Sequence, residues 1–517
     1  MSIPKRAETS APKDLVDTFV DTGTLEVLLS ARDHQVIYGR RGTGKTHALV
    51  YLAESRKEQG DIPVYIDLRT VGSTGGIYND PQIPLAERAT RLIQDVLAHI
   101  HDALLTFAVE NEDALNLGVV GPILDQFIEA ATETIVVGNT VLSQSEQSTR
   151  KMETSISGGL AAKSGVHATA SAKEQDSDVR TSAASSSGTT HHTIKFGSMQ
   201  ATLGKVIDSM TPKRLWILLD EWSTIPLDLQ PLLADLLRRT VFPLRGTTVK
   251  IAAIDQRTRL QQSVPGGDYI GIEVGADASA DLNLDDFMVF DNDAQRAVDF
   301  FTTLLFRHYK AVMGTVKNAP VLQSESDFIR FSFTQKTAFE ELVRAAEGVP
   351  RDAINILGMA SQRAIDKNIA VAHVRNAANA WYTRDKMSAL ASDELASRLL
   401  HWIVDEVIAH RKARAFLLLS TKHHYLIDKL FDARLLHVLK RNISAPEQPG
   451  IRYDVYKIDY GCYVNLLSTA KDPQGLLPAI DDQGRETYVQ VPPDDYRAIR
   501  RAILDLDEFE SAMLSDV

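Results

Sequence analysis

Cysteine is nearly absent from this sequence: Cys462 is the only one among 517 residues. An intramolecular disulfide framework and a cysteine-rich zinc site are therefore excluded, and we expect a reducing, cytoplasmic compartment. The N-terminus lacks the apolar core of a signal peptide. No run approaches the roughly eighteen apolar residues that span a bilayer. We therefore expect a soluble protein that has no membrane partner.

An excess of positive charge is also missing. The formal net charge of -12 argues against a general nucleic-acid coat, although it leaves room for a local basic module. The sequence contains no internal repeat. A hydrophobic content of 44% allows sizeable cores, and the length suggests roughly two to four domains.

A phosphate-binding pattern is present near the start of the chain. A short apolar strand at 36–38 runs into Gly-x-x-x-x-Gly-Lys-Thr at 39–46, and a helix-forming stretch follows, which is a P-loop in its required setting. Glycines let backbone amides wrap a triphosphate, and the helix N-terminus adds its positive dipole end. Lys45 is predicted to reach the β- and γ-phosphates, and the Thr46 hydroxyl to bind Mg²⁺. The predicted ATP contacts are Gly39, Arg40, Arg41, Gly42, Thr43, Gly44, Lys45, Thr46 and His47.

A second strong signal is the apolar strand at 213–219, which ends in Asp220 and Glu221. An unbroken apolar run indicates a strand covered on both faces, in the middle of a parallel sheet. Another strand candidate at 62–67 follows the P-loop helix, and this strand–helix–strand order predicts an α/β layer. We expect Asp220 to hold Mg²⁺, directly or through water, and Glu221 to polarise the attacking water.

The strand at 248–254 is followed by a polar tip that contains Asp255, Gln256, Arg257 and Arg259. A sensor of the γ-phosphate would belong there, because strand tips on this edge lie beside the ligand. We expect the last sheet strand between 265 and 291. Further along, Gly348 stops one helix and Pro350 starts the next, which places Arg351 in a first helical turn.

The segment at 142–193 consists mostly of Ser, Thr, Ala and Gly, with no aromatic residue except histidine. It buries too little apolar surface to offset its chain entropy, so we predict an inserted arm. The arm is either disordered, which we favour, or ordered only against a partner. His191 and His192 lack a spaced partner for a metal site.

The C-terminal part contains helical stretches at 371–384, 393–410 and 425–440. Two strands are expected within 451–464, with a turn near 459–461. Three helices and a hairpin outline a winged helix, although many unrelated helical domains match that outline. Residues 410–441 hold eight Lys or Arg against two acids, which predicts a nucleic-acid contact or, alternatively, a solvated face that pairs with acidic surface. The candidate DNA contacts are Arg411, Lys412, Arg414, Lys422, Lys440 and Arg441.

Taken in order, these motifs resemble an AAA+ ATPase, and most of all the origin-recognition-complex initiator clade. The resemblance covers about 27–365, and loosely 370–467 for a winged helix. It implies that Asp220 and Glu221 are the Walker B pair, that Asp255 or Gln256 is the first sensor, and that Arg351 is the second. Candidates for an arginine finger that serves a neighbouring subunit are Arg257 and Arg259, with Arg238 and Arg239 behind them.

Two departures keep an alternative open. The inserted arm is not part of the AAA+ core, and the tip at 254–257 also resembles the strand end of STAND signalling ATPases. In that family the arginine would make Arg257 a sensor for its own subunit.

The predicted fold is therefore an α/β P-loop parallel sheet with helices on both faces, a helical lid and a C-terminal winged-helix-like domain. The predicted parts are an N-terminal tail and helix (1–26), an ATPase core with the arm (27–291), a lid (292–369), a winged-helix-like domain (370–470) and an acidic tail (471–517). We expect a switch that hydrolyses ATP with Mg²⁺, assembles with its own copies or a partner ATPase, and binds DNA. The alternative is a STAND-like signalling or anti-phage defence ATPase whose C-terminal region binds a protein.

Overall fold

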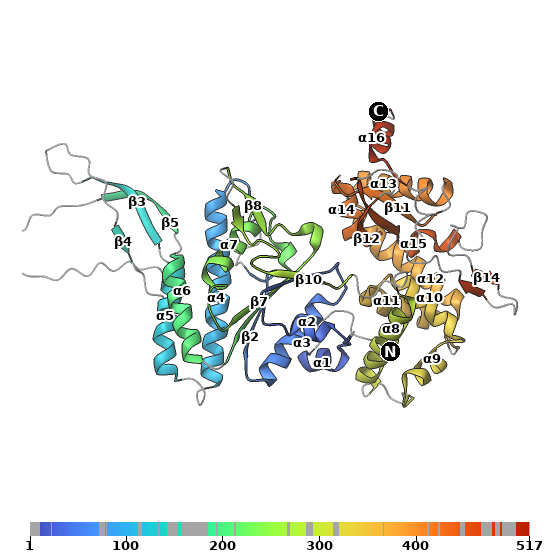
Figure 1. The fold of residues 1–517 in the computed structure, drawn as a ribbon, viewed down its shortest axis with the longest axis horizontal. Helices are drawn as coiled ribbons and strands as arrows, with labels where there is room; N and C mark the ends of the chain where they lie inside the picture. Colours follow the sequence, from blue (N-terminus) through green and yellow to red (C-terminus); the bar gives the residue numbers. More distant parts are fainter. Residues whose placement is uncertain are drawn as a thin grey trace, which may run out of the picture.

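A five-stranded parallel sheet organises the N-terminal part of the computed structural model (Figure 1). The strands lie in the order β10-β1-β7-β6-β2, and every neighbouring pair runs parallel. The predicted α/β class is thus confirmed. The strands are β1 (Gln35–Tyr38), β2 (Ile62–Asp67), β6 (Leu215–Asp220), β7 (Thr247–Ala253) and β10 (Ser279–Asn283). The structure describes residues 11–21, 23–71, 78, 80–111, 116–132, 134–141, 154–156, 185–192, 195–210, 213–265, 269–285, 293–313, 320–365, 367–410, 413–421, 424–444, 450–466, 478–480, 486–488 and 503–515.

Helices cover both faces of the sheet, as the unbroken apolar run of β6 predicts. Every residue of β6 is buried, and its side chains alternate between two cores. Trp216 and Leu218 pack on one face with α3 (Lys45–Glu58) and α2 (Leu25–Leu29). Leu215, Ile217 and Leu219 pack on the other face. The helices of that second face are α4 (Leu85–Glu110), α5 (Leu117–Thr132), α6 (Phe196–Met210) and α7 (Gln230–Thr240).

The last strand of the sheet lies within the predicted interval of 265–291, although not at its most apolar segment. Within the predicted interval, the apolar segment Tyr269–Gly271 forms β9, which pairs with β8 (Gln261–Ser263) in a small antiparallel hairpin outside the main sheet. The sheet strand is instead β10, a less apolar segment that lies beside β1 at the edge. An edge strand has only one neighbour, so its sequence carries a weaker signal. The apolar segment 287–290 lies outside the described residues.

Helix α4 bears on the expectation that no segment spans a membrane. By length and composition it is the one helix among the described residues that is long and apolar enough to cross a membrane. Its apolar side chains are nevertheless part of the core beside the sheet, where Leu92, Val96 and Ile100 are almost completely buried. A core helix of this kind passes the same test of composition.

The arm differs from the favoured prediction in its two described segments, β4 (Thr154–Ile156) and β5 (Ser185–His192), which pair with a strand that precedes the arm. Strands β3 (Thr134–Val141) and β5 pair antiparallel along their whole length, and β4 pairs with the start of β3. Figure 1 shows this ribbon extending from the ends of α5 and α6. Other residues of the arm lie outside the described part of the chain.

The lid and the C-terminal region share one continuous core. The lid helices are α8 (Ala294–Met313), α9 (Glu325–Ser332), α10 (Lys336–Ala346) and α11 (Pro350–Arg363). Their buried side chains belong to the same cluster as those of α12 (Val371–Trp381), α13 (Glu394–Val404) and α16 (Leu506–Ser515). In Figure 1 these helices gather on the side of the molecule opposite to the arm.

The C-terminal region departs from the predicted outline. A strand, β11 (Ala415–Leu419), separates α13 from α14 (Tyr425–Asp432), and it pairs with β13 (Arg452–Ile458). The hairpin joins β13 to β12 (Leu436–Ser444) and does not turn near 459–461. Asp459 instead caps the short helix α15 (Tyr460–Tyr463), because its Oδ1 accepts the Gly461 N–H at 2.9 Å. The predicted helix at 425–440 was therefore too long, and the hairpin was placed one strand too late.

Candidate functional site

The phosphate loop connects β1 to α3 at the carboxyl edge of the sheet. Gly42 and Gly44 have φ values of +87° and +100°, which residues with a side chain rarely adopt. A Cβ on Gly39 would lie 2.6 Å from Thr43 Oγ1, so this position also requires glycine. The Lys45 ammonium donates to the carbonyls of Gly39 at 2.6 Å and Arg40 at 3.0 Å. Lys45 thus faces the concave side of its own loop.

The two predicted acids lie at the same edge. β2 and β6 run in register, with Asp67 beside Asp220. Asp220 is fully buried; its Oδ1 accepts the Glu221 N–H and its Oδ2 accepts the Tyr65 hydroxyl, each at 2.8 Å. Glu221 follows with a left-handed φ of 57°, an uncommon conformation for a residue with a side chain.

The pKa values show that these groups act on one another. Burial lowers the pKa of Lys45, while the nearby carboxylates of Glu221, Asp285 and Asp220 raise it. Burial raises the pKa of Glu221, and the charge of Asp220 raises it further. The structure therefore brings Lys45 together with both acids, although about 175 residues separate them in sequence. A carboxylate with a raised pKa suits general-base chemistry.

The polar tip of β7 forms a short 3-10 helix at Asp255–Arg257. Its place beside β6 is fixed by the Ile254 N–H, which donates to Ser223 Oγ at 2.7 Å. Gln256 Oε1 is buried and has no hydrogen-bond partner, so it could accept from a bound water or ligand. Asp255 pairs with Arg441, and Arg257 with Asp432, so both side chains contact the C-terminal region.

Arg351 lies against the loop. Its N–H donates to the Gly42 carbonyl at 3.3 Å, and a Cβ on Gly42 would come within 2.9 Å of Arg351 Cβ. Its positive charge lowers the pKa of Lys45. The first turn of α11 therefore packs directly on the apex of the phosphate loop.

Several predicted contacts point elsewhere. The His47 side chain bonds the Leu15 carbonyl at 2.5 Å and lies edge-on to Phe19, away from the loop. The Arg40 side chain bonds Asp285 and His437, outside the loop's concave side. Arg41 is exposed, and Arg259 has an exposed side chain while its N–H donates to Gln230 at 2.7 Å.

The reserve candidates for an arginine finger are also paired. Arg238 and Arg239 both bond Asp235 one turn earlier in α7. Arg238 also lies over the ring of Tyr269.

The predicted DNA contacts are only partly visible. Arg411, Lys412 and Lys422 lie outside the described residues. Arg414 is half-buried and Lys440 is exposed, whereas Arg441 forms the ion pair with Asp255. In this arrangement, Arg441 faces the ATPase core.

Four residues of the site were not predicted: Tyr65, Asp285, Asp432 and His437. Tyr65 alternates with the buried residues of β2, and its position near the carboxyl end of that strand was the available signal. Asp285 lies two residues after the end of β10, a strand whose exact position within 265–291 the sequence did not predict. Asp432 and His437 arrive from the C-terminal region through tertiary contacts that no local pattern reports.

The residues present can hold Mg²⁺ only together with a nucleotide whose phosphate oxygens also bind the metal ion. In the part of the chain that the structure describes, no group of three or more His, Cys, Asp or Glu side chains is placed to hold a metal ion. Thr46 and Asp220 would provide the protein's share of an Mg²⁺ shell. Mg²⁺ in such sites takes one or two protein ligands and completes its shell with phosphates and water.

Sequence similarity between this chain and known proteins is low. Two solved structures are similar to this chain, each with 12% identity over 90% of it. They are the Walker-type ATPase of Pyrococcus abyssi (98% of that chain, TM-score 0.39) and Cdc6p from Pyrobaculum aerophilum (95% of that chain, TM-score 0.30). No curated protein matches the chain significantly. The ORC-CDC6-like family model matches residues 3–60, and over this segment, which contains the phosphate loop, the chain resembles that family.

Proposed function

We propose that this protein is an ATP-binding and ATP-hydrolysing switch of the AAA+ kind. The observation that carries the proposal is the meeting of Lys45, Asp220 and Glu221 at one edge of the parallel sheet. A phosphate-wrapping loop alone would suit many nucleotide-binding proteins. A buried Asp220 followed by a half-buried Glu221 beside this lysine suits hydrolysis of the terminal phosphate.

Each residue takes a separate role. Lys45 binds the β- and γ-phosphates, and Arg351 and Gln256 contact the γ-phosphate from the lid and from the β7 tip. Glu221 orients and deprotonates the attacking water, a task that its raised pKa favours. Mg²⁺, when bound, neutralises the developing phosphate charge. Asp220 has hydrogen bonds on both oxygens, so a water-mediated contact with the metal suits it best.

The direct experiment compares three variants in ATP binding and steady-state hydrolysis. Lys45→Ala should lose binding, because the phosphates lose their buried cation. Glu221→Gln should retain binding and lose turnover by about 100-fold or more. Glu58→Gln, an exposed change at the end of α3, is the matched control. Equal hydrolysis rates for wild type and Glu221→Gln would refute the proposal.

Assembly, DNA binding and the cytoplasmic location belong to the same proposal. ATP would act by its different affinity for two arrangements of the lid and C-terminal region. The basic segment at 410–441 would contact DNA, and Arg411, Lys412 and Arg414 changed to Glu should then abolish salt-dependent binding.

A signalling switch of the STAND kind is the second candidate, and one contact favours it. Arg257 Nε donates to Asp432 of the same chain, which supports a sensor for its own subunit. Mixing Arg257→Ala with Lys45→Ala separates the two roles. An arginine finger acting on a neighbouring subunit would restore activity in the mixture, whereas a sensor for its own subunit would not.

A further inference from the structure

Arg40 belongs to the phosphate loop, yet its side chain is only 2% exposed and leaves the loop. One carboxylate fixes it from the side of the sheet. The Arg40 N–H donates to Asp285 Oδ2 at 2.9 Å, and its Nε donates to Asp285 Oδ1 at 2.7 Å. Backbone and side chain are therefore held by the same residue, so the guanidinium cannot turn without moving the loop.

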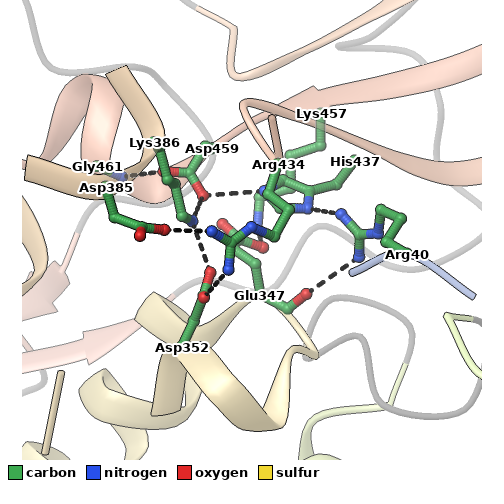
Figure 2. A network of polar contacts seen from close by, with 10 residues as sticks. All are labelled: Arg40, Glu347, Asp352, Asp385, Lys386, Arg434, His437, Lys457, Asp459 and Gly461. Atoms are coloured by element: carbon green, nitrogen blue, oxygen red, sulfur yellow. Dashed lines mark hydrogen bonds and ion pairs between the residues drawn. The ribbon is translucent and has the colours of Figure 1, made fainter. Parts of the chain in front are cut away.

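The other nitrogens of Arg40 reach two distant segments. Nη1 bonds Nδ1 of His437 on β12, and Nη2 donates to the Glu347 carbonyl at 3.5 Å, at the end of α10 (Figure 2). One guanidinium thus joins the phosphate loop, the lid and the C-terminal region. Arg40 is 307 residues from Glu347 and 397 residues from His437 in sequence.

The contacts continue behind His437. Its Nε2 donates to Asp459 at 3.0 Å, and Asp459 also bonds Lys386. Lys386 lies 3.0 Å from Asp352 in the first turn of α11, directly after Arg351. Figure 2 shows that this line of groups runs from the loop to the start of α11. Lys457 closes a second branch by donating to Glu347 at 2.6 Å.

Two features restrict this network: its groups are buried, and Arg40 sets the direction of the hydrogen bonds. His437, Lys457, Glu347 and Asp352 are fully buried, and a buried charge that loses its partner leaves a large desolvation cost. Arg40 can only donate, so Nδ1 of His437 accepts and Nε2 carries the hydrogen given to Asp459. The bonds from Arg40 through His437 to Asp459 therefore have one direction, and the network joins the phosphate loop to the start of α11.

Lys45 connects this network to the ligand. Its ammonium donates to the carbonyls of Gly39 and Arg40, which the Arg40 contacts hold in place. A bound triphosphate needs that ammonium for its own oxygens. The hydrogen bonds of Arg40 thus stabilise the conformation in which the Lys45 ammonium is bonded to its own loop. A phosphate group must compete with these carbonyls for the ammonium.

We propose that Arg40 is a positioning residue that couples the phosphate loop to the lid and C-terminal region through Glu347 and His437, so that nucleotide binding and the position of β12 control each other. The inference rests on the proposed nucleotide function. Linkage is reciprocal: if nucleotide weakens the contact with His437, then removing His437 raises the affinity for nucleotide.

The test measures the Kd of a fluorescent ATP analogue with Mg²⁺ for wild type, Arg40→Lys, His437→Phe and the double variant. Each single variant should bind about fivefold more tightly, a change within the usual range of coupling between sites. The double variant should bind no more tightly than Arg40→Lys, because that substitution already removes the contact with His437. His401→Phe, an exposed histidine on α13, is the matched control and should bind like wild type.

A merely structural role would lower the unfolding temperature of His437→Phe and leave its Kd within twofold of wild type. That result, weaker binding, or additive effects in the double variant would overturn the inference. Amide hydrogen exchange of wild type supplies a readout that needs no variant: residues 436–444 should exchange faster with nucleotide, and unchanged exchange contradicts the coupling. Absence of any nucleotide binding by wild type would refute the proposed function itself.

Discussion

Arg441 on β12 and Asp255 at the tip of β7 form an ion pair, with 2.7 Å between Nη2 and Oδ2. Beside it, Arg257 of the same tip donates to Asp432 at the end of α14. The β7 tip and the C-terminal region each contribute one acidic and one basic side chain, so the two surfaces are complementary in charge. Both Asp255 and Arg441 were predicted to contact other partners, the γ-phosphate and DNA. In the structure, they form an ion pair with each other instead.

This pair makes a prediction for DNA binding. If Arg441 contacts phosphates of DNA, then Asp255 competes with them, and Asp255→Asn should raise the affinity for duplex DNA about two- to tenfold. Arg441→Glu should lower it and reduce the salt dependence by about one counterion. Fluorescence anisotropy over a series of salt concentrations measures both. Equal affinities for wild type and both variants would remove Arg441 from the DNA surface.

Tyr65 predicts a change in metal dependence. Its hydroxyl holds Asp220 in place, and groups that orient a metal-binding carboxylate commonly change metal affinity about 10-fold or more. Tyr65→Phe should therefore raise the Mg²⁺ concentration needed for half-maximal ATP hydrolysis, with little effect at saturating Mg²⁺. Tyr425→Phe, at an exposed tyrosine of α14, serves as the control. An unchanged Mg²⁺ titration would separate Asp220 from the metal.

Gly42 predicts how closely the lid must pack on the loop. Gly42→Ala meets two obstacles, the left-handed φ and the contact with Arg351, whereas Gly60→Ala meets only a left-handed φ in open space. We expect Gly60→Ala to cost about 1 kcal/mol of unfolding free energy and to retain turnover. Gly42→Ala should cost about 1–3 kcal/mol more and lower ATP hydrolysis. If Gly42→Ala and Gly60→Ala lost the same stability and kept the same turnover, then the lid could move away from the loop without cost.

The parts of the site that consist of a local sequence pattern could be predicted from the sequence. The phosphate loop and the acids after β6 each occupy a few consecutive residues next to an apolar strand, so periodicity and composition sufficed. The C-terminal hairpin was misplaced because composition does not show where α14 ends. Arg434 adopts a φ of 62° and ends α14, and the Leu435 N–H closes the helix on the Leu430 carbonyl at 2.9 Å. The apolar residues that follow fit a helical period equally well.

The contacts around Arg40 could not be predicted from the sequence at all. Arg40 and His437 are 397 residues apart, and neither lies in a pattern that names the other. The same holds for Asp285, which depends on the correct placement of an edge strand. Pairing between charged groups is decided by tertiary geometry, and a basic segment such as 410–441 can pair with its own protein as readily as with DNA.

His437 predicts the pH dependence of stability. Burial and the charge of Arg40 lower its pKa from 6.5 to about 3, despite the opposing effect of Asp459. Above pH 6.5 the histidine is neutral in both folded and unfolded chains, so its full contribution is present. Below pH 6.5 the unfolded chain takes up the proton while the folded chain does not, and the unfolding free energy falls by up to about 1.4 kcal/mol per pH unit until pH 3.

Denaturant unfolding at pH 7 and pH 5 measures this dependence. Burial also lowers the pKa of His47, to about 4, and the pKa values of His34 and His308, so the wild-type slope contains contributions from these histidines as well. His437→Phe should unfold more easily at pH 7 and lose less additional stability between pH 7 and pH 5. His401→Phe, at an exposed histidine of α13, is the control for the replacement of a histidine by phenylalanine. A slope in His437→Phe as steep as that of wild type would mean that His437 takes up its proton over the same pH range in the folded and unfolded chains, and that burial and Arg40 do not lower its pKa.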